Sequence, residues 1–214
     1  MKKLLLILAL VLCLLLSGCG AKDPYEGIEN PSATITLTDG RVMYFELLLR
    51  DAPNTVANFV SLANQGYYDG LEIFRVVPGV LAQTGDKNND GTGNAGYTIQ
   101  GEFAANGIEN EVKHIRGTIS MCRTSSYDSA SSQFFIVGGS YPEYDGEYAA
   151  FGRALDSESL EVIDDITTVQ VDSNYSPIGN MPRIDSVRVS THGYKYTPAT
   201  IALPEETEGE ADKK

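Results

Sequence analysis

The sequence predicts a mainly β domain with two α-helices and a flexible segment at each end. Short runs alternate between apolar and polar residues with a period of two, which is typical of half-buried strands. Two longer segments instead place apolar residues at helical spacing, and glycine-rich stretches connect many of these elements. Many strands with two helices indicate a β-barrel or a β-sandwich with helical plugs, and composition alone does not choose between them.

The first regular element is a β-hairpin. Residues 33–38 alternate apolar and hydroxyl side chains, and Asp39-Gly40 is a strong signal for a tight turn. After the turn, every second residue is apolar, so the second strand has one face that can be buried. The residues of that face are Met43, Phe45, Leu47 and Leu49.

Two amphipathic helices follow. The first is expected to begin at Asp51-Ala52-Pro53, with Asp51 as the candidate N-cap and Pro53 in the first turn. Gly66 can end this helix in the left-handed conformation. The second helix is expected over residues 159–168. The inward faces consist of Val56, Phe59, Val60 and Ala63 in the first helix, and of Leu160, Ile163 and Ile166 in the second.

Further short strands complete the domain, which we expect to span residues 32–193. Residues 194–214 end in an acidic run and are expected to be disordered and dispensable for folding. The further strands are expected at residues 72–76, 81–84, 133–137, 149–152 and 185–190.

The N-terminus resembles the leader of a bacterial lipoprotein. Residues 4–16 form a run of 13 apolar residues after Met1-Lys2-Lys3, short for a membrane span but suited to a signal peptide. Leu16-Ser17-Gly18-Cys19 resembles the lipoprotein box, in which the chain is cut before an acylated cysteine. The resemblance implies a signal peptide at residues 1–18, a lipidated Cys19, a tether over residues 19–31 and a place at the outer face of the cell membrane. A plain signal peptide with a chance cysteine is the alternative.

Charge and cysteine content restrict the partners. The chain carries a net charge of −13 without a cluster of lysine or arginine, so we expect no nucleic-acid partner. Of its three cysteines, Cys13 lies in the signal peptide and Cys19 is the expected acylation site. Cys122 alone remains, and we expect no disulfide within the domain.

Several motifs follow one another in a fixed order. In residues 73–86, an arginine precedes Pro78-Gly79 and a glutamine precedes Gly85-Asp86. The later motifs are Gly91-Thr92-Gly93, residues 117–121, residues 131–136, and Asp145-Gly146 before Phe151-Gly152. This ordered set resembles the cyclophilins over residues 33–190. The resemblance implies a closed eight-stranded antiparallel barrel capped by two helices, and peptidyl-prolyl cis/trans isomerase activity.

Isomerisation of an X–Pro bond requires no nucleophile, metal or redox group. The barrier of ~18–20 kcal/mol arises because rotation breaks the C–N resonance of the amide. A protein can help with an apolar slot for the proline ring, donors for the flanking backbone, and a donor directed at the twisted amide. We therefore expect no cofactor and no metal.

The resemblance assigns the residues of the site. Arg75 would be the catalytic donor, because a guanidinium is planar and keeps its charge, with Gln83 holding the substrate backbone and Phe135 in the proline slot. Taken alone, Arg75 reads as a surface cation and Phe135 as a core aromatic. The other substrate-binding residues implied are Val80, Leu81, Tyr144 and Tyr148 along the slot, and Gly93, Cys122 and Arg123 elsewhere in the groove.

The sequence departs from the common cyclophilin pattern at the slot. It has Val80-Leu81 where the family tends to have Phe-Met, Glu143 in place of a tryptophan and Tyr148 in place of a histidine. The loop over residues 122–131 is also one residue longer. These changes argue against tight cyclosporin binding more than against catalysis.

Three motifs are set aside as chance matches. The G-x-G-x-x-G pattern of residues 91–96 precedes an extended run rather than a helix. Residues 86–91 begin like an EF-hand loop, but Tyr97 stands where the ligating glutamate belongs, which leaves at most a weak calcium contact. His114 and His192 are the only histidines and are too scattered for zinc.

We therefore expect a lipid-anchored, monomeric peptidyl-prolyl isomerase that acts on proline-containing unfolded or exported polypeptides. One alternative is a binding module or chaperone that grips proline peptides with little turnover. Another is a structural surface protein that reuses the barrel. The presence of both Arg75 and Gln83 favours the enzyme.

Overall fold

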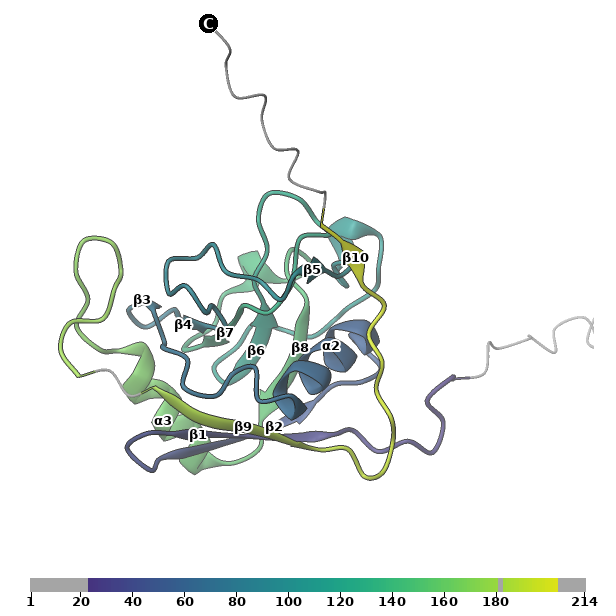
Figure 1. Ribbon diagram of the computed structural model, residues 1–214, viewed down its shortest axis with the longest axis horizontal. Coiled ribbons are helices and arrows are strands. Elements are labelled where there is room, and N and C mark those ends of the chain that lie inside the picture. The colour runs from purple at the N-terminus through teal and green to yellow at the C-terminus, as the bar shows by residue number, and fades with distance from the viewer. Residues whose placement is uncertain (1–22, 181–182, 204–214) are drawn as a thin grey trace, which may run out of the picture.

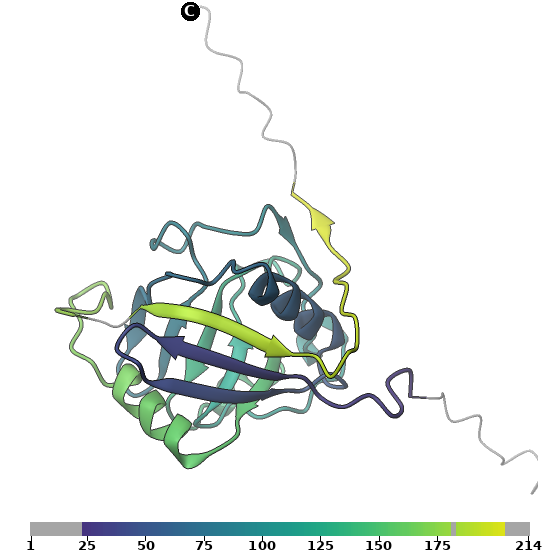
Figure 2. The ribbon, with the colours of Figure 1, turned by 60° about the horizontal axis from the view of Figure 1, so that its bottom comes forward.

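The computed structural model describes residues 23–180 and 183–203, and its main feature is one eight-stranded sheet with two α-helices (Figures 1 and 2). A second, two-stranded sheet pairs β5 (Tyr97–Thr98) with β10 (Ile201–Ala202). The strands of the large sheet are β1 (Ser32–Leu37), β2 (Val42–Leu47), β3 (Arg75–Val77), β4 (Leu81–Thr84), β6 (Thr118–Met121), β7 (Phe134–Val137), β8 (Ala150–Ala154) and β9 (Ile184–Ser190). The helices are α2 (Pro53–Asn64) and α3 (Ser157–Thr167), with short 3-10 turns η1 (Ala104–Asn106) and η2 (Pro142–Tyr144).

The large sheet is curled but open. Its strand order is β3-β4-β7-β6-β8-β2-β1-β9, and within the described residues no ladder joins β3 to β9. The predicted closed barrel is therefore wrong. Connecting segments occupy the gap: Val76 donates its backbone N–H to Tyr175, and Gly70 and Leu71 bond the backbone of Ile184. Because these segments satisfy the edge groups, the two edges do not pair with each other.

One apolar core fills the curl of the sheet. Phe59 of α2 lies at its centre, with ring centroids 5.2 Å from Tyr68 and Phe151 and 5.3 Å from Phe134. Helix α2 packs against β9, and α3 packs against β2 and the ends of β3, β4 and β7. The two helices therefore lie on either side of the β1–β2–β9 strands (Figure 2).

The helix ends show one wrong prediction and its cause. Ala52, not Asp51, is the N-cap of α2, and it supplies no side-chain bond. The buried carboxylate of Glu102, 5% exposed, instead accepts the backbone N–H groups of Asn54 (2.9 Å) and Thr55 (2.7 Å). This cap comes from a distant loop, so local sequence could not indicate it.

The other helix ends follow local signals. Gly66 adopts the predicted left-handed conformation after α2, with φ 71°. Helix α3 begins two residues earlier than predicted, because Asp156 caps it by accepting the N–H of Ser159 at 2.7 Å. In the described part of the chain, no helix is long and apolar enough to cross a bilayer.

The N-terminal segment packs on the domain earlier than predicted. Arg50 pairs with Asp23 at 2.7 Å and donates to the carbonyl of Tyr25 at 2.6 Å, while Pro31 accepts the N–H of Leu47. Residues 23–31 of the predicted tether thus belong to the folded domain. The predicted signal peptide (1–18), Cys19 and the rest of the tether lie outside the described residues.

The C-terminal segment is also folded where the structure describes it. After β9 the chain runs past α2 to β10, beside β5 (Figure 1). The prediction of a disordered tail is therefore wrong for residues 194–203, while residues 204–214 lie outside the described part.

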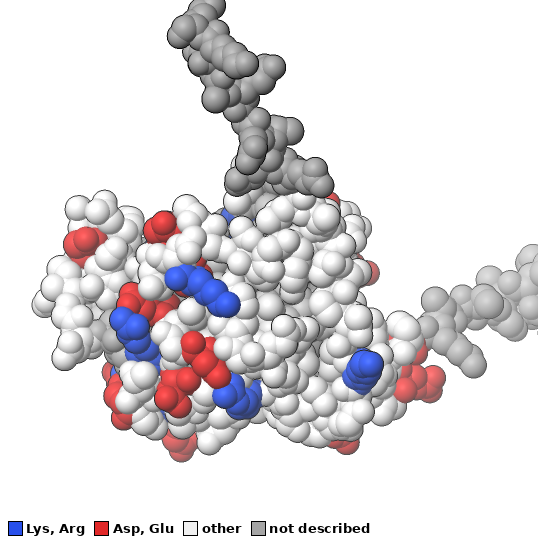
Figure 3. Space-filling model, in the orientation of Figure 1, with Lys and Arg blue, Asp and Glu red and all other residues white. Residues whose placement is uncertain are grey.

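Basic and acidic side chains are interspersed on the face shown in Figure 3. Ion pairs on the surface include Arg188 with Asp69 and Arg153 with Glu46, both at 2.7 Å. Because cations on this face have acidic neighbours, it offers no extended basic surface to a phosphate backbone.

Candidate active site

A tight turn between β3 and β4 sets the geometry of the site. Pro78 and Gly79 are the central residues of the turn, and Val80 donates its N–H to Val77 at 2.8 Å. Gly79 has a φ of 73°, a conformation that favours glycine, and proline fits the position before it. The turn fixes the register in which Arg75 lies directly opposite Gln83.

One row of side chains crosses four strands. The register places Arg75, Gln83, Phe135 and Ser120 side by side on β3, β4, β7 and β6. Directly opposed residues in antiparallel strands point to the same face of a sheet, so this row shares one face. The next row, Val76, Ala82, Ile136 and Ile119, points the other way and is buried in the core. The catalytic candidates therefore occupy the outer face without displacing core residues.

An aromatic slot opens beside this row. Phe135 lies against Tyr148 and Tyr144, with ring centroids 5.6 and 6.0 Å away and nearly perpendicular planes. Such an apolar wall can hold a proline ring by van der Waals contact. The slot encloses about 200 Å³ and is lined by Arg75, Leu81, Gln83, Cys122, Arg123, Phe135, Tyr144 and Tyr148.

A chain of amides holds Arg75 in place. Its Nη1 donates to Gln83 Oε1 at 3.1 Å, and Gln83 Nε2 donates to Gln133 Oε1 at 2.9 Å. Gln133 in turn donates to the carbonyl of Gly93 at 2.8 Å. The guanidinium also lies 5.7 Å from the ring centroid of Tyr175. Within the described residues, Arg75 makes one side-chain hydrogen bond, so most of its N–H groups remain available to a substrate.

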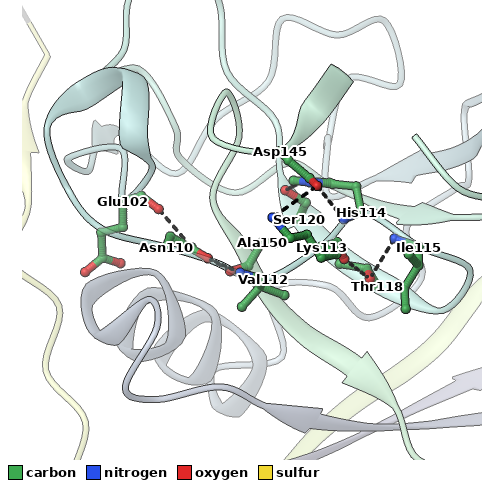
Figure 4. A network of polar contacts seen from close by, with 10 residues as sticks. All are labelled: Glu102, Asn110, Val112, Lys113, His114, Ile115, Thr118, Ser120, Asp145 and Ala150. Atoms are coloured by element: carbon green, nitrogen blue, oxygen red, sulfur yellow. Dashed lines mark hydrogen bonds and ion pairs between the residues drawn. The ribbon is translucent and has the colours of Figure 1, made fainter. Parts of the chain in front are cut away.

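The ring of His114 packs against the ring of Phe135. The two rings are stacked, with centroids 6.1 Å apart and an interplanar angle of 17°. Nδ1 of His114 lies 3.1 Å from Asp145 Oδ1, and Nε2 lies 3.0 Å from Ser120 Oγ (Figure 4). Burial lowers the pKa of His114, against the opposing effect of Asp145, so the ring is neutral near pH 7. Nδ1–H then donates to Asp145, and Nε2 accepts the Ser120 hydroxyl.

The carboxylate of Asp145 accepts hydrogen bonds from both the backbone N–H and the ring of His114. Burial acts to raise its pKa, but hydrogen bonds from the backbone and ring of His114 and the charge of Lys113 lower it overall. Asp145 therefore stays ionised and keeps the imidazole oriented. Nearby, Asn110 donates to the carbonyls of Glu102 and Ala150 at 2.9 Å, which ties the adjoining loop to β8 (Figure 4).

Cys122 and Arg123 form the rim between the slot and the next pocket. Burial raises the pKa of the Cys122 thiol to about 12, with the charge of Arg75 opposing the shift. The thiol is therefore protonated at neutral pH, although Cys122 is only half-buried. Arg123 donates to the carbonyl of Glu147 at 2.9 Å and lies 4.8 Å from the ring centroid of Tyr148. Its side chain is thus held against the slot wall.

A second pocket of about 290 Å³ adjoins the slot and shares Gln83, Cys122 and Arg123 with it. Gly93 lines this pocket and passes so close to Asp86 that a side chain at this position would clash with the carboxylate. The Asp86 carboxylate accepts the backbone N–H of Gly91 at 2.6 Å, so its role in the EF-hand-like loop is structural. Among the described residues, no group of three or more metal-ligating side chains is present.

Most of the predicted site residues meet at the slot. Val80 packs beside Leu81 but does not line the slot, and Gly93 lies in the second pocket. Cys19 lies outside the described residues. The supporting residues Gln133, Tyr175, His114 and Ser120 were not predicted as part of the site. Gln133 and Ser120 do stand in the predicted motifs, whereas only the fold brings Tyr175 and His114 to the site.

The comparisons with known proteins agree on one family. The profile of cyclophilin type peptidyl-prolyl cis-trans isomerases matches residues 33–189. The chain is 40% identical over 146 residues to a peptidyl-prolyl cis-trans isomerase of Helicobacter pylori (68% of this chain, 82% of that protein). It is 44% identical over 117 residues to peptidyl-prolyl cis-trans isomerase B of Bacillus subtilis (55% and 78%).

A solved structure supports the same relationship. A cyclophilin type isomerase of Cryptosporidium parvum, crystallised in the presence of the dipeptide Ala-Pro, matches with a TM-score of 0.65 and 28% identity, covering 74% of this chain and 98% of that one. The chain therefore belongs to the cyclophilin family. Its activity is peptidyl-prolyl cis-trans isomerisation, as named for relatives that are 40–44% identical over most of their own length.

Proposed function

We propose that this isomerase acts on X–Pro bonds of exported polypeptides at the outer face of the cell membrane, with Arg75, Gln83 and Phe135 as its catalytic residues. The observation that supports these roles is the row that places Arg75 and Gln83 on the outer face, beside Phe135. A charged donor, a neutral amide and an apolar ring thus meet at one small slot.

The aromatic slot and Arg75 have different roles in the reaction: the slot binds the proline ring, and Arg75 stabilises the twisted amide. The proline ring packs against Phe135, while Arg75 directs an N–H group at the prolyl nitrogen. As the amide twists, that nitrogen becomes pyramidal and gains lone-pair density, so the donor binds it more strongly than in the planar ground state. No bond of the substrate is broken, and the proton of Arg75 stays in place. Arg75 therefore lowers the barrier by electrostatic stabilisation alone.

Gln83 and the rim hold the chain on either side of the proline. Gln83 is already fixed by Arg75 and Gln133, so little freedom is lost when it bonds the substrate backbone. Arg123 and Gly93 both line the second pocket, so the main chain of Arg123 lies along the path of the peptide. These contacts position the peptide so that one half can rotate while the other is held.

The proposed location rests on the N-terminal sequence. Residues 16–19 resemble a lipoprotein box after an apolar run, and acylation at Cys19 with more than one chain would anchor the protein stably. Asp23 is already docked on Arg50. Four peptide steps from Cys19 to Asp23 span at most roughly 14 Å, so the domain would lie against the bilayer surface. Clients would be chains that emerge there.

The catalytic proposal is tested with Arg75→Ala on a proline tetrapeptide. We expect kcat/KM to fall by about 10²–10³, the usual loss when one preorganised donor is removed. Arg153→Ala is the matched control, because Arg153 is an exposed arginine on β8 of the same sheet, ion-paired with Glu46. A folded Arg75→Ala protein with wild-type kcat/KM would contradict the proposal.

The location is tested separately with Cys19→Ala. We expect this variant to leave the membrane fraction or to remain unprocessed, while Cys13→Ala, which alters only the apolar run, stays membrane-bound. Mass spectrometry of the mature N-terminus supplies the direct measurement. An unmodified N-terminus at another residue would rule out the anchor without affecting the catalytic proposal.

A further inference from the structure

The chain continues along the domain beyond the part that matches the family. That match ends at residue 189, yet residues 194–203, here called the C-terminal strap, run past α2 and reach β5 (Figure 1). Strand β10 of the strap pairs with β5, with Ile201 opposite Thr98 and Ala202 opposite Tyr97. The strap therefore ends at the loops that border the substrate groove.

Two attachments fix the position of the strap. Asn54 on α2 binds both backbone groups of Ala199: its Nδ2 donates to the carbonyl at 3.0 Å, and its Oδ1 accepts the N–H at 2.7 Å. Strand β5 is itself held, because Tyr97 donates to Asn58 and accepts from Ser131, both at 2.7 Å. A two-residue ladder is marginal alone, so the Asn54 clamp is needed to hold its register.

The strap ends in a wall of the second pocket. Leu203 lines this pocket together with Thr98 and Gly93 and is 40% exposed. Leu203 is the aliphatic member of the lining: the other lining residues are glycine, serine, threonine, asparagine, glutamine, cysteine and arginine. The one aliphatic side chain among the described residues that line this pocket thus comes from a residue outside the family match.

We propose that Leu203 is a specificity-determining residue. A peptide whose proline occupies the slot passes the shared residues Gln83 and Arg123 and enters the second pocket. An apolar side chain that enters there buries surface against Leu203, whereas Leu203 offers a charged side chain no partner. The enzyme therefore favours proline peptides with an apolar residue at the position that reaches the second pocket. This inference rests on the groove assigned in the proposed function.

The test uses full-length protein and a panel of proline tetrapeptides. Each position around the proline is set in turn to Ala, Leu, Phe or Glu, and kcat/KM is measured for every peptide. The variants are Leu203→Ala, Leu203→Trp and Asn54→Ala, which releases the strap without altering the groove. Leu155→Ala is the control, because Leu155 is an exposed leucine beside α3 and far along the chain from the strap.

At the peptide position that reaches the second pocket, wild type should have a higher kcat/KM for Leu and Phe than for Ala and Glu. Leu203→Ala and Asn54→Ala should each reduce that preference by about three- to tenfold, less than for a fully enclosed pocket because Leu203 is partly exposed. Leu203→Trp should lower kcat/KM for the Phe peptide while Ala peptides are spared. Leu155→Ala should leave every ratio unchanged.

Uniform changes across the panel, or none, in Leu203→Ala and Leu203→Trp would overturn the inference. The same peptides are also titrated by NMR to obtain Kd. If wild type binds them without turnover, the proposed catalytic roles fail, and the Kd ratios still decide the role of Leu203. If turnover is normal and the ratios do not move, the strap proposal alone fails.

Discussion

Phe134 and Phe135 are consecutive, of the same type and almost equally buried, 0% and 3% exposed, yet they belong to different parts of the molecule. Phe134 lies in the core, with ring centroids 5.3 Å from Phe59 and 5.4 Å from Tyr68. Phe135 points to the other face of β7 and joins the aromatic slot with Tyr148. One strand therefore serves both faces of the sheet.

The comparison shows that burial alone does not separate structure from function in this fold. Residues alternate across a strand, so one register assigns Phe134 to the core and Phe135 to the site. The core cluster is large and shared by most elements, whereas the slot cluster is small and open to a ligand. Core-face changes should therefore act mainly on stability, and outer-face changes mainly on turnover.

The largest expected difference is between Phe134→Ala and Phe135→Ala. Phe134→Ala should lower the free energy of unfolding by ~3–5 kcal/mol, because it leaves a cavity in close-packed surroundings. Phe135→Ala should cost less stability but abolish most of the isomerase activity of the folded protein. Urea denaturation and the peptide assay measure the two effects, with Phe134→Leu and Phe135→Leu as milder counterparts. Equal stability losses with equal activities would remove the distinction between the faces.

A smaller effect is expected at the C-terminal strap, which touches the core cluster only at its edge, through the partly buried Tyr196. Truncation after Gly193 removes the bonds between Asn54 and Ala199 and the β5–β10 pairing. We expect a loss of about 1–2 kcal/mol, because these bonds are exposed and each contributes at the low end of about 0.5–1.5 kcal/mol. That corresponds to a Tm lower by roughly 2–8 °C. Truncation after Leu203 is the control, and an unchanged Tm in the shorter protein would show that the strap does not stabilise the domain.

Protonation of His114, which packs against Phe135, should make the stability of the folded protein depend on pH in the acidic range. The folded-state pKa of His114 is lowered by burial, so as pH falls the unfolded state takes up a proton first. The stability contribution is complete above the unfolded pKa of about 6.5 and declines as pH drops from there toward the lower folded pKa. His114→Asn, which keeps a donor for Asp145, should flatten this decline, whereas His192→Asn should not. A pH dependence of unfolding that is the same in His114→Asn and wild type would contradict this origin.

The smallest effect is expected at Cys122. Because burial raises its pKa to about 12, the thiol should not ionise in the working range and should react slowly with iodoacetamide at neutral pH. Cys122→Ala should keep nearly full activity. Rapid alkylation of the folded protein at pH 7 would show that this edge of the slot is more open than the structure indicates.

Local patterns predicted the elements with clear periodicity. Met43, Phe45 and Leu47 alternate along β2 and are all buried, and Ile163 and Ile166 face inward on α3. Strand β6 was not predicted as a strand, although Thr118 to Met121 alternate hydroxyl and apolar side chains; the structure buries all four residues. Strand β10 has two residues, both exposed, which is too short for a periodic pattern, so its pairing with β5 depends on the fold.

Only those site residues that stand in a family motif could be predicted from the sequence. Arg75, Gln83 and Phe135 stand in motifs whose order resembles one family, and the register brings them together. The supporting contacts join residues far apart in sequence, such as His114 with Phe135 and Arg75 with Tyr175. The open sheet was missed for the same reason, because loop residues that satisfy the edges of β3 and β9 leave no local signal.

The central claim is that Arg75 acts on the twisted amide rather than on the bound ground state. The direct measurement is the rate of cis–trans exchange of a proline tetrapeptide at saturating enzyme, followed by NMR exchange spectroscopy together with Kd. We predict that Arg75→Ala slows exchange on the enzyme by about 10²–10³, while Kd changes by less than about tenfold. Arg75→Lys should recover little, because an ammonium lacks the planar fork. An exchange rate on folded Arg75→Ala equal to that on wild type would contradict the account.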